Sequence, residues 1–223
     1  MKRTIKMLLI AVTMLTAACT EQKTTKVVME TTAGTMEFVL YNETPSHRDN
    51  FISIVEECGY DSLLFHRVIP GFMIQGGDPD SKYAEAGVRL GEGGPDYRID
   101  AEFIPTLHHR RGTLAAAREG DRVNPTKSSS ASQFYIVWGK VYSPEEFDSM
   151  AQRMKELGMG EMTAEQKEIY TTVGGTPFLD GQYTVFGEIT SGLEVVDKIQ
   201  NVGTDNFDRP LQDVRIISVK VIE

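Results

Sequence analysis

Short apolar runs separated by Gly, Asp, Asn and Pro recur along most of this chain and constrain its fold more than any other feature. Residues 27–41 hold two segments of alternating apolar and polar side chains, with Gly34 between them. Such alternation is typical of strands that are buried on one face. Further short runs lie at residues 67–75, 113–117, 134–137, 184–189 and 214–222. Many short strands with few helices favour a closed antiparallel barrel, because closure removes the exposed edges of a sheet.

A helical insertion is predicted at residues 141–173, where the strand pattern is interrupted. Ser143 and Glu146 form a capping box with proline between them, and Thr163 and Gln166 begin a second helix. The apolar positions with helical spacing are Phe147, Met150, Met154 and Leu157. We expect the insertion to pack its Met-rich face on the barrel; a role in gripping a partner or substrate is the alternative.

Two other stretches have helical spacing of apolar residues, residues 50–58 and residues 192–199. With 40% hydrophobic residues, the chain can bury one sizeable core, which predicts a single domain. The chain has only two cysteines. We expect Cys58, at the end of the first of these helices, to be structural rather than redox-active.

The first 18 residues have the pattern of a secretory signal, with basic residues, then an apolar run, then small residues before Cys19. This order resembles bacterial lipoprotein signals, which implies cleavage before Cys19 and attachment of lipid to its sulfur. Thr16 departs from the usual motif, which has Leu there. An ordinary secreted protein cut near Ala18, or a retained anchor, is the alternative. Residues 19–26 would form a polar tether, and residues 27–223 the folded domain.

The chain is acidic, with a formal charge of -9 from 23 basic and 32 acidic side chains. Removal of residues 1–18 takes away three basic side chains and no acidic one, which leaves a charge of -12. Nucleic acids and anionic lipid surfaces are bound by clustered Lys and Arg. The charge therefore argues against both as partners.

The run at residues 65–78, FHRVIPGFMIQGGD, combines Gly and Pro with one arginine, one glutamine and several apolar side chains. Arg67 and Gln75 supply hydrogen-bond donors beside an apolar floor, which suits a neutral peptide. The run contains no Ser, Cys or Lys, and His66 has no adjacent Asp or Ser, so the pattern favours non-covalent chemistry. We expect strand alternation to turn His66 away from Arg67, and we expect no metal at the adjacent His108 and His109.

This run resembles the signature of the cyclophilins, the peptidyl-prolyl cis-trans isomerases. Residues 112–118, 130–136 and 178–187 are similar to cyclophilin segments in the same order. The resemblance covers most of the chain from about residue 26, but not the stretch from about 140 to 175. It implies a mainly β fold, a closed eight-stranded antiparallel barrel capped by two helices. It also implies a monomer that needs no cofactor.

The resemblance assigns catalysis to Arg67, whose guanidinium would stabilise the twisted amide. It implies substrate contacts from Phe72, Met73, Gln75, Ala117, Arg118, Gln133, Phe134, Phe178, Leu179 and Tyr183, with the proline ring among Phe72, Met73, Phe134 and Leu179. Arg118 replaces the Asn of eukaryotic cyclophilins, and Tyr183 stands where a simple alignment with the family His fails. Phe178 replaces Trp and lacks its indole N–H, which predicts weak cyclosporin binding.

The two resemblances thus imply a lipid-anchored prolyl isomerase of the cell envelope. Analogy with lipoproteins favours the outer membrane, facing the periplasm, with surface exposure as the alternative. Its partners would be proline-containing unfolded or exported polypeptides. The alternative is a binding module that holds proline-containing segments without turnover. An intact Arg67 favours the enzyme, because binding alone would tolerate its loss.

Overall fold

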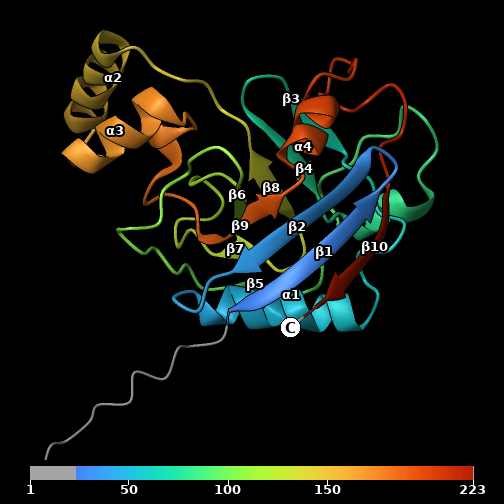
Figure 1. Cartoon of the computed structure of the whole chain (residues 1–223). Helices are drawn as coiled ribbons and strands as arrows, with labels where there is room; N and C mark the ends of the chain where they lie inside the picture. Colours follow the sequence, from blue (N-terminus) through green and yellow to red (C-terminus); the bar gives the residue numbers. More distant parts are fainter. Residues whose placement is uncertain (1–23, 223) are drawn as a thin grey trace, which may run out of the picture.

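The computed structural model describes residues 24–222, and its main element is a curled antiparallel sheet (Figure 1). The order of its 8 strands is β10-β1-β2-β9-β6-β8-β4-β3. These strands are β1 (Thr25–Thr31), β2 (Gly34–Leu40), β3 (Arg67–Ile69), β4 (Met73–Gly76), β6 (Thr113–Ala116), β8 (Phe134–Val137), β9 (Val185–Ser191) and β10 (Ile216–Val221). Strands β5 (Arg98–Ile99) and β7 (Ser129–Ser130) form a separate small sheet.

The predicted closure of the barrel is not supported, and the sheet is a half-barrel. Its edge strands, β3 and β10, share no ladder in the described part of the chain. Leu64 and Arg215, which precede these strands, form an isolated bridge, and backbone hydrogen bonds join residues 62–65 to residues 214–216 around it. Strand β3 is three residues long because Pro70, which has no N–H, follows it and the chain turns at Gly71. A strand this short cannot form the continuous ladder that would close the barrel.

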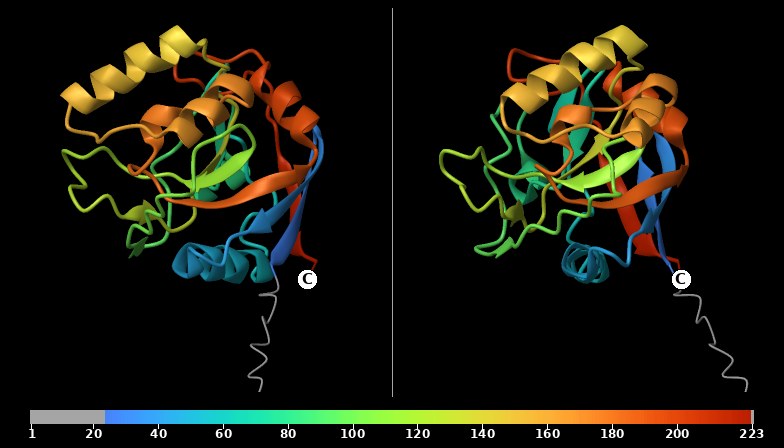
Figure 2. Two further views of the ribbon diagram at one scale, coloured as in Figure 1. Left: turned by 60° about the vertical axis from the view of Figure 1, so that its left-hand side comes forward. Right: turned by 90° about the vertical axis from the view of Figure 1, so that its left-hand side faces the viewer.

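Two helices lie at opposite ends of the curled sheet, α1 (Pro45–Glu56) and α4 (Leu193–Gln200) (Figures 1 and 2). Helix α4 buries the predicted side chains Val195, Val196 and Ile199. Helix α1 begins earlier than predicted, because proline occupies its first turn, and it ends before Cys58. Cys58 is an exposed free cysteine with a φ of 55°.

The predicted helical insertion consists of α2 (Pro144–Glu156) and α3 (Ala164–Thr172), which lie beside each other away from α1 (Figure 2). Both predicted capping boxes are present. The Phe147 ring of α2 stacks on the Tyr170 ring of α3, with centroids 6.2 Å apart. Leu157 is an exception to the predicted apolar face, since α2 has ended there and the side chain is 66% exposed.

The core divides into two clusters on the two faces of the sheet. In β8, Phe134 and Ile136 belong to the larger cluster, which α1 and α4 also supply. Tyr135 and Val137 point the other way, into a smaller cluster with Met73 and Leu179. Strand alternation therefore separates the main core from the face that carries the site.

The predicted signal segment and lipid-attachment residue Cys19 lie outside the described residues. The end of the predicted tether, Thr25 and Lys26, already belongs to β1. No helix within residues 24–222 has the length and apolar character needed to cross a membrane.

Candidate active site

A cleft of about 700 Å³ opens on the face of the sheet that carries the smaller apolar cluster. Most of the predicted site residues border it; these are Arg67, Phe72, Met73, Gln75, Ala117, Arg118, Phe178, Leu179 and Tyr183. They come from β3, β4 and the segments that follow β6 and precede β9. The structure thus brings together residues that lie more than a hundred positions apart in the sequence.

The hairpin of β3 and β4 places Arg67 and Gln75 side by side. Its register pairs Arg67 with Gln75, and Arg67 Nη1 donates to Gln75 Oε1 at 3.4 Å. The turn between the strands is closed by Phe72 N, which donates to Ile69 O at 3.0 Å. Proline followed by glycine suits this turn, because Gly71 has a φ of 70° that other residues rarely adopt. The turn therefore places Arg67 on the same cleft as the apolar side chains of Phe72 and Met73, which follow the turn.

Gln133 supports the site from behind. Its Oε1 accepts a hydrogen bond from Gln75 Nε2 at 3.0 Å. Its own Nε2 donates to the carbonyl oxygens of Gly91 and Gly93 at 3.0 and 2.8 Å. The amide was predicted to contact substrate, but in the structure both of its ends are engaged by the protein. It borders an adjoining polar cleft of about 830 Å³ rather than the apolar one.

The apolar slot of the cleft contains Tyr135 in place of the predicted Phe134. Phe134 is 1% exposed and packs edge-on against Phe51 and Tyr60 in the main core. The prediction was wrong because neighbouring strand residues face opposite sides, and in β8 it is Tyr135 that faces the cleft. The ring of Tyr135 meets that of Tyr183 edge-to-face at 5.9 Å.

Two further aromatic rings form the rim of this slot. Phe72 and Phe178 stack with centroids 5.8 Å apart, and Phe178 is 40% exposed. Met73 and Leu179 are buried in the same apolar cluster as Tyr135. The slot is thus apolar and aromatic at the point where the guanidinium of Arg67 borders it, which suits a small uncharged ring.

The guanidinium of Arg118 is occupied by the protein. Its Nε donates to Gln182 O at 2.8 Å, and its Nη1 donates to Glu119 O and Asp121 Oδ1 at 2.9 and 2.7 Å. The same group lies 4.3 Å from the centroid of the Tyr183 ring. Arg118 therefore holds Tyr183 and its own loop in place, and leaves backbone groups rather than the guanidinium for a ligand.

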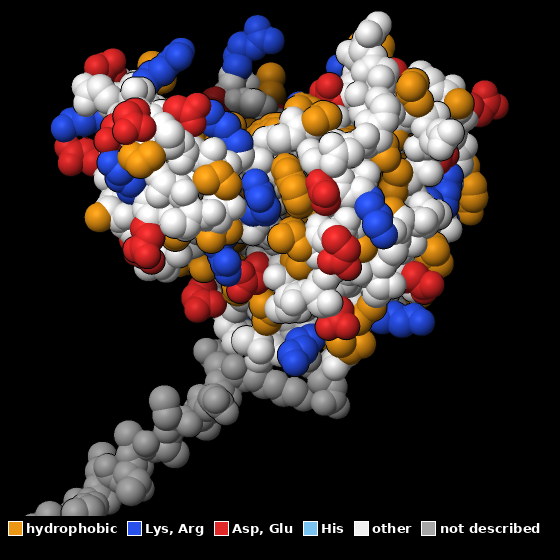
Figure 3. Space-filling view, turned by 45° about the horizontal axis from the view of Figure 1, so that its top comes forward, with side chains coloured by type: hydrophobic (Ala, Val, Ile, Leu, Met, Phe, Trp, Pro, Cys, Tyr) orange, Lys and Arg blue, Asp and Glu red, His pale blue; other side chains and the backbone are white. Residues whose placement is uncertain are grey.

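Residues 88–92 and 205–209 form a second wall of the cleft, and Val68 N of β3 donates to Asp208 O of this wall at 2.8 Å. Asp208 Oδ2 lies 3.4 Å from Arg67 Nε. Arg209, which is 4% exposed, donates from Nη1 to the carbonyl oxygen of Val88 and so joins the two segments of this wall. On the face drawn in Figure 3, acidic and basic side chains are interspersed rather than gathered by sign.

Comparison with known proteins identifies the family. The model of the protein family described as "Cyclophilin type peptidyl-prolyl cis-trans isomerase/CLD" matches residues 26–221. A putative peptidyl-prolyl cis-trans isomerase of Staphylococcus aureus is 35% identical over 207 residues, which cover 91% of this chain and 94% of that protein. The chain belongs to the cyclophilin family.

Other relatives agree with this assignment. Peptidyl-prolyl cis-trans isomerase-like 1 of Gibberella zeae is 30% identical over 90% of this cyclophilin and 96% of its own length. A putative bifunctional phosphatase/peptidyl-prolyl cis-trans isomerase of Streptococcus pyogenes is 34% identical, and this chain spans 39% of it.

A solved structure shows the same fold. The cyclophilin-type isomerase of Cryptosporidium parvum superimposes with a TM-score of 0.64 at 23% identity, over 90% of this chain and 99% of that one. A second structure of the same protein, obtained in the presence of the dipeptide Ala-Pro, has a TM-score of 0.62 at 23% identity and covers 89% of this chain and 99% of that one.

His66 of this cyclophilin borders the cleft together with Arg67, although alternation predicted that the two would part. The prediction was wrong because β3 begins only at Arg67, so the pleat does not set the direction of His66. The imidazole is 3% exposed, and neither ring nitrogen has a hydrogen-bond partner within residues 24–222. Burial lowers the pKa of His66 to about 4, so the ring is neutral at pH 7.

Sequence reasoning missed Tyr135, the second wall, and the surroundings of His109. Alternation in residues 134–137 could have revealed Tyr135, because one of two adjacent aromatic residues must leave the core. No local signal placed Asp180 against His109, 71 positions away, yet their side chains are 2.9 Å apart. Within residues 24–222, no group of three or more His, Cys, Asp or Glu is placed to hold a metal ion.

Proposed function

We propose that this cyclophilin catalyses rotation about X-Pro peptide bonds with Arg67 as its catalytic residue. The observation that carries the proposal is the position of the Arg67 guanidinium, held by Gln75 and Asp208 at the edge of an apolar aromatic slot. The Ala-Pro dipeptide present with the Cryptosporidium parvum relative supports proline-containing peptides as the substrate class.

The reaction needs no covalent step. Resonance gives the X-Pro bond a rotational barrier of about 18 to 20 kcal/mol. When the bond twists, resonance is lost and the prolyl nitrogen gains a lone pair that neither ground state offers. A donor aimed at this nitrogen stabilises the transition state selectively, and so raises the rate constant. A reduction of the barrier by about 8 kcal/mol would give roughly a millionfold acceleration.

Each part of the cleft has a role in this proposal. The slot of Phe72, Met73, Tyr135 and Leu179 would bury the proline ring and fix one side of the bond. Arg67 would donate to the prolyl nitrogen, since its guanidinium stays charged at any relevant pH. Gln75, whose amide is oriented by Gln133, would help to hold a substrate carbonyl.

The test is the cis-to-trans rate of a short Ala-Pro peptide with the purified chain and with Arg67→Ala. We expect strong acceleration that falls by about 100-fold or more in the variant, by analogy with the loss of one transition-state donor. Peptide binding, measured by NMR titration, should persist. An Arg67→Ala variant that isomerises at the unmutated rate would overturn the mechanism, and a correctly folded chain without acceleration would favour a binding module.

We further propose that the protein is a monomer, lipid-anchored through Cys19, that assists the folding of exported polypeptides in the cell envelope. The order of basic, apolar and small residues before Cys19 supports the anchor. Metabolic labelling with a palmitate analogue tests it, with Cys19→Ala as the control. Equal labelling of both forms would refute attachment at this residue.

Cyclosporin binding should be weak. Phe178 stacks on Phe72 and offers no N–H donor at the rim of the slot. We expect a dissociation constant in the micromolar range or above, and tighter binding by Phe178→Trp, both measured by calorimetry. Nanomolar binding by the unmutated chain would contradict this expectation.

A further inference from the structure

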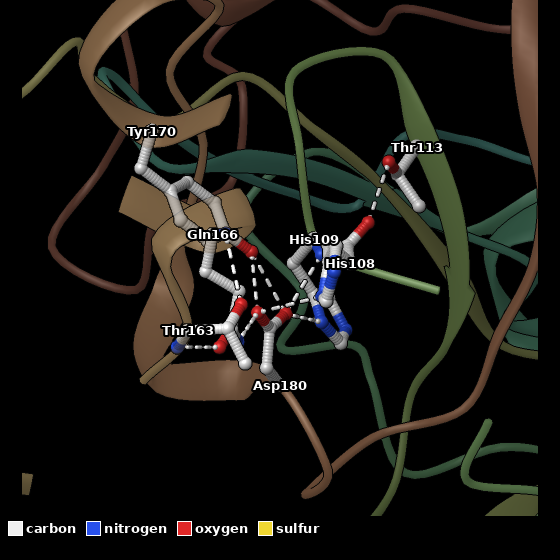
Figure 4. Close-up of polar contacts among 7 residues, drawn as sticks. All are labelled: His108, His109, Thr113, Thr163, Gln166, Tyr170 and Asp180. Carbon is white, nitrogen blue, oxygen red and sulfur yellow. Dashed lines mark hydrogen bonds and ion pairs between the residues drawn. The ribbon is translucent and has the colours of Figure 1, made fainter. Parts of the chain in front are cut away.

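The helical insertion is tied to the rest of the molecule through one buried carboxylate, that of Asp180. The side chain of Asp180 is 9% exposed and directly follows the turn Pro177–Leu179, which supplies Leu179 to the slot. Tyr170 of α3 donates from its hydroxyl to Asp180 Oδ2 at 2.7 Å, and Gln166 Nε2 donates to the same oxygen at 2.8 Å (Figure 4). Helix α3 therefore grips the segment that carries one wall of the slot.

Gln166 is fixed by a second hydrogen bond. Its Oε1 accepts from the backbone N–H of Thr163 at 2.9 Å, as part of the capping box that begins α3. One amide group thus serves both the helix end and Asp180 (Figure 4). The position of the carboxylate is consequently set by the fold of the insertion.

On its other side, Asp180 orients two histidines. Its Oδ1 accepts from His109 N at 2.8 Å and from His109 Nδ1 at 2.9 Å, and His108 Nδ1 lies 3.4 Å from Oδ2. Burial opposes the charge, but the hydrogen bonds from His108 and His109 hold the pKa of Asp180 well below its ordinary value. A carboxylate only accepts, so the fully buried His109 ring carries a proton on Nδ1.

The chain of contacts ends at the wall of the slot. His109 Nε2 and the hydroxyl of Tyr135 are hydrogen-bonded at 3.0 Å. The two rings are nearly parallel, at 13°, with centroids 6.1 Å apart. Burial raises the pKa of Tyr135 well above its ordinary value, so the hydroxyl keeps its proton. The Tyr135 hydroxyl is therefore a tether for the ring, and the ring itself faces the cleft.

We propose that Asp180 is a positioning residue through which the α2–α3 insertion sets the shape of the proline slot, by way of His109 and Tyr135. The inference rests on the proposed function of that slot as the site of the proline ring. Strand β8 fixes the backbone of Tyr135, but the tilt of its ring depends on the hydroxyl. Loosening the network would widen the slot and weaken ring burial, while Arg67, on β3, keeps its geometry.

The test uses two substitutions that each remove one hydroxyl and keep the ring, Tyr170→Phe and Tyr135→Phe. For each we expect the KM for an Ala-Pro peptide, and the dissociation constant from NMR titration, to rise about fivefold, as for the loss of one hydrogen bond. The value of kcat should change by less than about twofold. The double variant should lose no more than either single one, since both act on one chain of contacts.

The matched control is Asp148→Asn, which breaks an exposed ion pair with Lys167 inside the same insertion and has no contact with Asp180. It should keep the unmutated KM. The ¹⁵N resonance of His109 Nε2 should shift in Tyr170→Phe and remain in place in Asp148→Asn, and this readout does not depend on activity. Unchanged KM and an unchanged His109 resonance in Tyr170→Phe, or additive losses in the double variant, would overturn the proposal.

Failure of the proposed function would look different. In that case the unmutated chain would not accelerate isomerisation, while the binding constants and the His109 resonance would still report on the network. If the unmutated chain accelerates isomerisation but Tyr170→Phe leaves KM unchanged, the proposed function stands and the role of Asp180 is overturned.

Discussion

The two walls of the cleft are built on different principles. The sheet wall is the part of the cleft formed by strands β3, β4 and β8. The directions of its side chains follow from strand register, which places Arg67 opposite Gln75. The loop wall, residues 88–92 and 205–209, has no strand register. It is held by side chains that reach backbone groups, as Arg209 does at Val88 and Gln133 at Gly91, and by one backbone hydrogen bond from Val68 N to Asp208 O. The comparison teaches that one wall is encoded locally and the other by a few long-range hydrogen bonds.

The largest effect should come from a change at the end of β4, where the chain passes close to the backbone of Ser132 and Gln133. Gly77 follows β4 with a φ of 88°, and an added Cβ would lie 2.2 Å from Ser132 O. We expect Gly77→Ala to lower the free energy of unfolding by about 3 kcal/mol in urea titrations, because the backbone of Ser132 must move. Gly87→Ala, with a φ of 79° in open space, is the control and should cost about 1 kcal/mol. Equal losses would mean that the contact with Ser132 is unimportant.

His66, buried beneath the loop wall, should make stability depend on pH. Its pKa is lowered from 6.5 to about 4, so the unfolded chain binds a proton that the folded chain rejects, and stability falls as pH falls through this window. Between pH 7 and pH 5 the loss should be about 2 kcal/mol in urea titrations. His66→Leu should remove this part of the slope. A variant with the full slope would show that other groups, such as His47, are responsible.

Gln133 is where the loop wall influences the sheet wall. Gln133→Ala removes the hydrogen bonds to Gly91 and Gly93 and releases the amide of Gln75. We expect kcat/KM for an Ala-Pro peptide to fall about tenfold, as for the loss of 1 to 2 hydrogen bonds. Gln152→Ala, which removes an exposed hydrogen bond to Glu156, is the control and should leave kcat/KM unchanged. Equal activity of the two variants would show that the loop wall does not affect catalysis.

The smallest effect should come from the ion pair between Arg67 of β3 and Asp208 of the loop wall. The side chains of Arg67 and Asp208 are each 42% exposed, so water and salt screen their attraction. We expect Asp208→Asn to change kcat/KM by less than about threefold, and 1 M salt to reproduce the change. Asp49→Asn removes a comparable pair with Arg48 outside the cleft and should have no effect on kcat/KM. A tenfold loss with Asp208→Asn would assign this carboxylate a direct part in orienting Arg67.

The same contrast explains how much could be predicted from the sequence. The hairpin of residues 27–41, the capping boxes of the insertion and most of the sheet wall follow local rules of period, turn and cap, and all are present. The predicted closure of the barrel was wrong, because closure depends on how the two edge strands, β3 and β10, meet in the tertiary fold. Phe134 was assigned to the slot because the motif was read without the pleat, which turns that ring into the core.

The remaining parts could not be read from neighbouring residues. Asp180 contacts His109 and Tyr170 only when the sheet and the insertion are assembled. In the loop wall, Arg209 binds Val88, which is 121 positions away in the sequence. Such contacts are decided by the tertiary fold rather than by propensity.

The placement of β1 also has a mechanical consequence. This first strand is paired along its length with β2 on one side and with β10 on the other, whereas the cleft lies on strands at the opposite end of the sheet order. A pull on the chain at residue 24 would load both ladders in shear, so that many hydrogen bonds share the force at once. Strands β3 and β4 lie outside that load path, and the cleft would keep its shape under tension.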